Sequence, residues 1–125
     1  MGEPFEEVAR RFLPKIPKPF PGVSHLLKIL GLTKTQRTLY DHYMLSLHNL
    51  MKGDLNYQRD VPQIEFSFPS QTTWIVMTDH VSHAAMVGQH MLEQTFYLPI
   101  FGMMDESLSP LRILEKISGQ RLVRL

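Results

Sequence analysis

The sequence predicts an α+β fold in which helices precede and follow about four antiparallel strands. Apolar residues recur at helical spacing up to Lys52, which predicts helices in the first part of the chain. After Asp54 the pattern changes: Ile64, Phe66 and Phe68 alternate with polar residues, which is typical of a half-buried strand. The closing stretch "SLSPLRILEKISG" then carries the residues that start and stop a helix.

A chain of 125 residues is long enough for one domain and too short for two. We therefore expect residues 1–125 to form a single unit. Its three predicted parts are a helical part over 1–53, a β part over 54–104, and a C-terminal helix and tail over 105–125.

Two segments are expected to form the first helices. Pro4–Leu13 has apolar residues at helical spacing, and Pro4 suits a first turn. The stretch "PKIPKPFPG" follows, and its four prolines predict an extended connector. Val23–Leu30 is predicted to be a short helix, with Gly31 as its stop.

Two further helices carry clear start signals. Thr33 and Gln36 have the spacing of a capping box, and a long helix is expected from there to about Lys52. The last helix is predicted between Ser109 as its cap, Pro110 at its first position and Gly119 past its end.

The strands are predicted between the last two helices. A turn at Pro69–Ser70 separates the first strand from "TTWIVMTD", which is apolar on both faces. The stretches "HAAMVG" and "MLEQTFYLPI" predict two more strands, broken near Gly88. Because the strands are consecutive and closely spaced, we expect antiparallel neighbours. Four strands do not close a barrel, so they form either a small sheet with helices on one face or part of a larger sheet.

The composition excludes several classes of site. The chain has no cysteine, which excludes disulfides, zinc–thiolate sites, iron–sulfur clusters and cysteine nucleophiles. No apolar run approaches the ~18 residues needed to span a bilayer. The first residues contain no secretion signal, so we expect a cytoplasmic protein. The basic residues form no dense run with interleaved aromatics, and nucleic-acid binding is not predicted.

The net charge of +1 is unevenly distributed along the chain. Up to Lys52 there are 8 Lys and Arg against 4 Asp and Glu, and from Gly53 onward there are 5 against 8. The positive part could contact an anionic partner or the surface of the inner membrane. Solvated helix faces explain the same pattern without a partner.

The clustered metal-ligand residue types are Asp79, His80, His83 and His90. Non-haem iron in oxygenases takes two histidines and one carboxylate on one face. In barrel-fold oxygenases the first histidine and the carboxylate come as H-x-D or H-x-E, and neither pattern occurs at any of the six histidines. His83 opens "HAAMVG" after a strand and a polar turn, so it is either the late iron histidine or a turn histidine.

Four long stretches resemble the Kdo hydroxylase family: "GEPFEEVARRFLP", "YDHYMLSLHNLMKGDLNYQRDVPQ", "FPSQTTWIVMTDHVSHAAMVGQHMLEQTFYLP" and "SPLRILEKISGQRLV". Its members are iron(II)- and 2-oxoglutarate-dependent oxygenases that act on 3-deoxy-D-manno-oct-2-ulosonic acid (Kdo), the inner-core sugar of lipopolysaccharide. The resemblance implies the C-terminal part of a double-stranded β-helix, a jelly-roll or cupin-like fold. The implied reaction oxidises a C–H bond at C3 of the sugar and yields the hydroxylated acid, carbon dioxide and succinate.

The same resemblance implies roles for particular residues. His83 matches the second iron histidine, and the first histidine and the aspartate are expected before Gly2. Gln94 is the polar residue in the region where many such oxygenases carry an oxoglutarate-binding Arg. An amide cannot form the bidentate ion pair that Arg forms with a carboxylate, so the main oxoglutarate anchor is expected elsewhere.

Three hypotheses remain open from the sequence. The first is a C-terminal fragment of such an oxygenase, inactive alone, whose partners are the N-terminal half of the barrel and a Kdo-containing lipid A glycolipid. The second is a small non-catalytic α+β binding or interaction domain. The third is an enzyme with a private metal site at Asp79, His83 and His90, which the absence of H-x-D disfavours. Unpaired strand edges predict that the chain associates with itself.

Overall fold

The computed structural model describes residues 2–18 and 38–123. The predicted helix Val23–Leu30 and the predicted cap at Thr33 and Gln36 lie outside the described residues. The α-helices are α1 (Phe5–Phe12), α3 (Leu39–Gly53), α4 (Leu55–Asp60) and α5 (Pro110–Ser118). Short 3₁₀ turns are η1 (Leu13–Lys15), η2 (Ile100–Gly102) and η3 (Glu106–Leu108).

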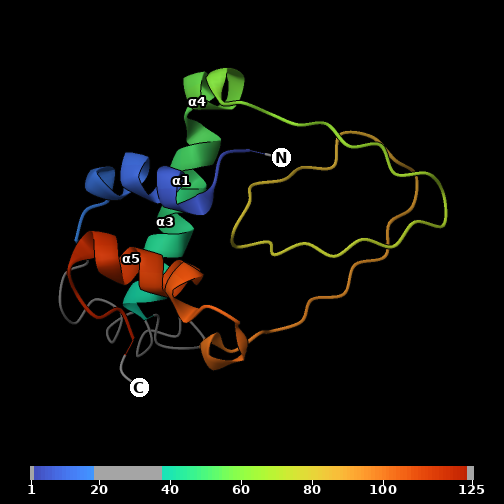
Figure 1. Ribbon diagram of the computed structural model, residues 1–125. Coiled ribbons are helices and arrows are strands. Elements are labelled where there is room, and N and C mark those ends of the chain that lie inside the picture. Colours follow the sequence, from blue (N-terminus) through green and yellow to red (C-terminus); the bar gives the residue numbers. More distant parts are fainter. Residues whose placement is uncertain (1, 19–37, 124–125) are drawn as a thin grey trace, which may run out of the picture.

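Helices α1, α3 and α5 pack together, and residues 62–99 leave this helical body as an extended arm (Figure 1). The side chains of Val8, Phe12, Leu47 and Leu114 are all buried in the helical body. Phe12 of α1 meets the ring of Tyr57 of α4 edge-on, with 5.0 Å between the ring centres. The helical body therefore has its own apolar core, built from segments far apart in the sequence.

The helix ends follow local rules that the sequence displays. Thr38 caps α3: its side-chain oxygen accepts a hydrogen bond from the backbone N–H of Asp41, whose carboxylate accepts one from the backbone N–H of Thr38. The long helix therefore begins at Leu39, later than predicted. At α5 the prediction is confirmed, because Ser109 is the N-cap and Gly119 ends the helix with a φ of +69°.

The proline-rich connector starts differently from the prediction. Pro14 lies in the 3₁₀ turn η1 rather than in extended chain, because proline is tolerated in a first helical turn, where no backbone donor is required. The backbone becomes extended at Ile16, whose side chain is buried against the helical body.

The four predicted strands are not found as strands. Among the described residues the structure contains one isolated antiparallel bridge, between Pro4 and Val81, and no strand. The arm is extended, as the alternating pattern predicted, but its consecutive legs do not form a hydrogen-bonded ladder with one another. A strand needs a neighbour to satisfy its backbone groups, and sequence adjacency did not supply one.

The arm leaves its apolar side chains in solvent. Ile75, Leu92 and Tyr97 are 96%, 103% and 95% exposed. The predicted β part also begins with a helix, α4, so the extended chain starts only at residue 62. The fold is therefore a helical body with a long apolar arm that has no covering layer among the described residues.

Candidate functional site

The arm touches the helical body immediately before His83. Pro4 pairs with Val81 in the antiparallel bridge, and the backbone N–H of Gly2 donates a hydrogen bond to the carbonyl oxygen of Ser82 at 3.2 Å. The hydroxyl of Ser82 donates to the sulfur of Met51 on α3 at 3.7 Å. These contacts from two segments fix the backbone from which the side chain of His83 projects.

The residues that hold Val81 and Ser82 are themselves anchored. Glu3 lies between Gly2 and Pro4, and its side chain is buried. One carboxylate oxygen of Glu3 accepts a hydrogen bond from Arg11 of α1 at 2.9 Å. Burial raises the pKa of Tyr57 to about 12, and the neighbouring carboxylate of Glu3 adds to the rise. An ion pair to α1 thus holds the short segment that carries the bridge.

One nitrogen of the His83 imidazole is engaged, and the other has no hydrogen-bond partner among the described residues. Its Nδ1 lies 3.1 Å from the carbonyl oxygen of Val81. Because a carbonyl oxygen only accepts, this contact is a hydrogen bond in the tautomer whose Nδ1 carries the proton. In that tautomer Nε2 keeps its lone pair, which is the state in which histidine binds a metal.

Aromatic side chains stand beside His83. The ring of Trp74 meets the imidazole edge-on, with 6.2 Å between ring centres and 85° between ring planes. The ring of Phe68 stacks on the ring of Trp74, with 5.2 Å between ring centres and 10° between ring planes. Phe66 in turn stacks on Phe68 at 6.4 Å. The sequence pattern placed these rings in two separate predicted strands and gave no signal that they form a row ending at His83.

The other candidate ligands do not join His83. Asp79 lies close enough to α3 that its charge, after burial, contributes to raising the pKa of Tyr40 to about 12. The Nε2 of His80 is buried and has no hydrogen-bond partner among the described residues. His90 is exposed. Within residues 2–18 and 38–123 no group of three histidines or carboxylates could hold a metal, so the private site at Asp79, His83 and His90 is not formed.

Gln94 is exposed in the last leg of the arm. No hydrogen bond joins its amide to another described residue. Its assignment to oxoglutarate therefore has no support from contacts within this chain and stays a prediction.

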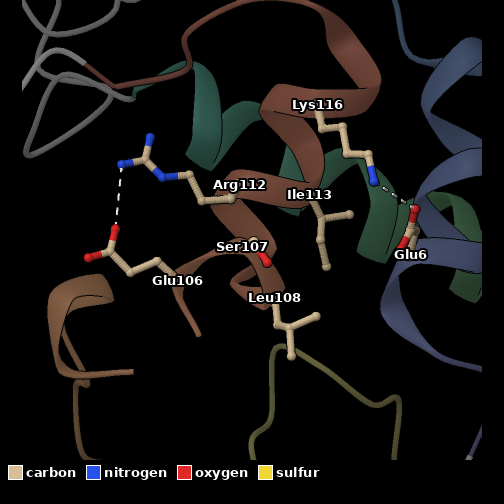
Figure 2. A pocket seen from close by; sticks show the side chains of 7 residues that line it. All are labelled: Glu6, Glu106, Ser107, Leu108, Arg112, Ile113 and Lys116. Carbon is tan, nitrogen blue, oxygen red and sulfur yellow. Dashed lines mark ion pairs between the residues drawn. The ribbon is translucent and has the colours of Figure 1, made fainter. Parts of the chain in front are cut away.

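A hollow of about 380 Å³ lies away from His83, between α1, η3 and α5 (Figure 2). Lys116 points at Glu6, with 3.9 Å between nitrogen and oxygen, and Arg112 points at Glu106 at the same distance. Arg112 also binds Glu115 at 2.8 Å. Because each cation in this hollow faces a carboxylate, the hollow has no unpaired charge with which to select an ionic ligand.

Comparison with known families decides the affiliation. The family model described as 3-deoxy-D-manno-oct-2-ulosonic acid (Kdo) hydroxylase matches residues 1–121. The chain belongs to the Kdo hydroxylase family. A search of curated proteins found no match.

Solved structures of the Kdo hydroxylase KdoO, a non-haem Fe(II) alphaketoglutarate-dependent dioxygenase, resemble this chain closely. One holds alphaketoglutarate and Fe(III), and shares 48% sequence identity and a TM-score of 0.92 over 98% of this chain. Another holds cobalt(II), with the same identity and score. This chain spans 42% and 41% of those two KdoO chains. The resemblance to a Kdo hydroxylase that was expected from the sequence is therefore confirmed.

No helix in the described part of the chain is both long enough and apolar enough to cross a membrane.

Proposed function

We propose that this chain forms the C-terminal part of an iron(II)- and 2-oxoglutarate-dependent Kdo hydroxylase, in which His83 supplies one iron ligand. One observation carries the proposal: in a chain of this family, His83 has its Nδ1 bonded to the carbonyl oxygen of Val81 and its Nε2 free. A single histidine with a free Nε2 fits one position of a site made of two histidines and one carboxylate. The described residues hold no set of three ligands, so the other two come from elsewhere in the complete enzyme.

The register of the bridge indicates where those ligands approach. Pro4 pairs with Val81 in antiparallel orientation, and the backbone N–H of Gly2 donates to the carbonyl oxygen of Ser82, the residue before His83. In a longer relative, chain that precedes Gly2 and continues this register runs beside the residues that follow His83. This agrees with an H-x-D pair expected before Gly2, because a strand in that place lies next to the iron histidine.

In this proposal the arm supplies strands to a double-stranded β-helix. The TM-score of 0.92 over 98% of the chain supports the same backbone course for the arm as in KdoO. Side chains such as Ile75 and Leu92, bare here, then face layers contributed by the rest of the barrel. The same exposure disfavours a self-sufficient binding domain, which would bury its own apolar surface.

When bound, iron and 2-oxoglutarate would supply the oxidising chemistry: dioxygen would be consumed, 2-oxoglutarate would be oxidised to succinate and carbon dioxide, and one oxygen atom would enter succinate while the other enters the substrate. The residues of this chain orient the metal ligand and keep its surroundings apolar. His83 orients Nε2 through the bond to Val81, and the row of Phe66, Phe68 and Trp74 keeps one side of His83 apolar. Gln94 contacts 2-oxoglutarate as a neutral hydrogen-bond donor, while a cationic residue elsewhere in the complete enzyme binds the carboxylate of 2-oxoglutarate. The substrate is the Kdo of a lipid A glycolipid, reached at the cytoplasmic surface of the inner membrane.

The test compares two histidines of the arm in the complete enzyme. His83→Ala is expected to abolish iron binding and Kdo hydroxylation, because it removes a metal–nitrogen bond. His90→Ala is the matched control, since His90 is also exposed and lies seven residues away; it is expected to leave most activity. Equal loss in the two variants would overturn the assignment of His83 as the ligand.

A further inference from the structure

We propose that Trp74 is a positioning residue that holds the imidazole of His83 in the orientation and tautomer that a metal requires; the proposal rests on the proposed function of His83. Two contacts orient the ring: the hydrogen bond from Nδ1 to Val81 and the edge-on contact with Trp74. His83 is exposed, and the hydrogen bond to Val81 alone would restrain its ring at one atom only. The indole adds a second restraint, approximately perpendicular to the imidazole plane.

Trp74 is itself held in place. Its ring stacks on Phe68 at 5.2 Å with the planes 10° apart. A turn between the two residues makes this possible: the backbone N–H of Thr72 donates to the carbonyl oxygen of Pro69 at 3.3 Å, and Gln71 has a φ of +68°. A positive φ at the third residue is the geometry of a type II turn. The turn reverses the chain, and so brings Phe68 and Trp74 face to face.

The row therefore continues from Phe68 through Trp74 to His83, across three successive legs of the arm. Groups that fix a metal-binding histidine without touching the metal commonly change metal affinity by about 10- to 100-fold when removed. Trp74 is absent from the core of the helical body, so its truncation leaves the packing of α1, α3 and α5 intact. An effect of Trp74 on metal binding is thus separable from an effect on folding.

The experiment measures cobalt(II) affinity of the complete enzyme by the visible absorption of the bound metal. Trp74→Ala is expected to weaken affinity about 10-fold, the lower end for an orienting group. Trp74→Phe keeps an aromatic edge contact and is expected to recover most of the loss. Tyr97→Ala is the matched control, because Tyr97 is an aromatic residue of the arm that is 95% exposed, and it is expected to bind as wild type.

A second measurement reads the imidazole directly. Nitrogen-15 NMR of the metal-free protein is expected to show His83 mainly with the proton on Nδ1, and Trp74→Ala is expected to shift it toward a mixture of tautomers. Wild-type cobalt affinity together with an unchanged tautomer in Trp74→Ala would overturn the role of Trp74. Wild-type cobalt affinity in His83→Ala would instead overturn the proposed function, so the two failures are distinguishable.

Discussion

The backbone N–H of Gly2 donates a hydrogen bond to the carbonyl oxygen of Ser82 at 3.2 Å, so two residues 80 positions apart lie side by side directly before His83. The segment around Gly2 is tied to α1 through the ion pair of Glu3 with Arg11. The backbone next to the candidate iron ligand is thereby linked to the helical body, although the leg of the arm that follows His83 is exposed.

Truncation of the α5 cap is expected to destabilise the helical body. The hydroxyl of Ser109 accepts from the backbone N–H of Arg112 at 3.3 Å and donates to the carbonyl oxygen of Glu106 at 2.7 Å. Loss of a helix N-cap costs about 1 kcal/mol. Ser109→Ala should therefore lower the free energy of unfolding by about that amount. Chemical denaturation followed by helical circular dichroism measures it, with the exposed Ser67→Ala as control; equal effects would contradict the capping role.

A buried hydroxyl joins α3 to the tail after α5. The amide of Gln120 donates to the hydroxyl oxygen of Tyr43 at 2.9 Å, and Tyr43 is buried. Tyr43→Phe keeps the ring and removes the acceptor, so unfolding free energy should fall by about 1 kcal/mol. Tyr97→Phe makes the same chemical change at an exposed site and should have little effect. A cost for Tyr97→Phe as large as that for Tyr43→Phe would sink the prediction.

Glu115 is expected to give the helical body a pH-dependent stability. Burial pushes the pKa of Glu115 upward, but hydrogen bonds from the backbone of Leu122 and the side chain of Arg112 outweigh it and lower the pKa from its ordinary 4.5. A carboxyl with a lowered folded-state pKa stabilises the fold fully above its unfolded-state pKa. That contribution is lost as the pH falls through the folded-state pKa, below 4.5.

Glu115→Gln tests this dependence by denaturation at several pH values. The variant should be less stable than wild type at neutral pH, and the difference should shrink as the pH falls below about 4.5. Glu93→Gln is the control, because Glu93 is exposed on the arm. A stability difference for Glu115→Gln that stays constant down to acidic pH would show that the charge of Glu115 is not its cause.

The arm is expected to make the isolated chain associate with itself. Ile75 and Leu92 are almost completely exposed on extended chain with free backbone groups, which invites pairing with a second copy. A double variant, Ile75→Lys with Leu92→Lys, should shift the sedimentation profile toward monomer, because charges on an edge oppose pairing. Leu45→Lys on α3 is the control, since Leu45 is 42% exposed and belongs to the helical body. A monodisperse wild-type monomer in sedimentation would contradict this prediction.

The sequence predicted well those features that short-range chemistry determines. The cap at Ser109, the stop at Gly119 and the extended character of the arm all depend on residues within a few positions of one another. The start of the long helix was misplaced because several threonines precede it in the sequence, and only Thr38 is followed three residues later by a carboxylate, that of Asp41, with which it forms a capping box. When several threonines could cap one helix, the hydrogen bonds of the folded chain decide which of them is the N-cap.

The pairing of the arm could not be predicted in the same way. Alternation in Ile64, Phe66 and Phe68 favours extended backbone, but does not identify the strand beside it. The rings of Phe68, Trp74 and His83 bring consecutive legs of the arm close together, but no hydrogen-bonded ladder joins these legs among the described residues, so the predicted strand pairing is not confirmed. The candidate site differs in the same way. His83 stood out in the sequence through its position after a predicted strand and a polar turn. Its contact with Trp74 depends on the turn between them, where the backbone N–H of His80 donates to the carbonyl oxygen of Met77, and this contact left no pattern in the sequence.

The central claim is that His83 supplies one ligand of an iron site that the described residues do not complete. The most direct measurement is succinate formation from 2-oxoglutarate by the isolated 125-residue chain with added iron(II), beside its His83→Ala variant. We predict no succinate above the level of His83→Ala, because the described residues do not bring a second histidine and a carboxylate to His83. Turnover by the wild-type chain that disappears in His83→Ala would contradict it, since the chain would then contain a complete iron site of its own.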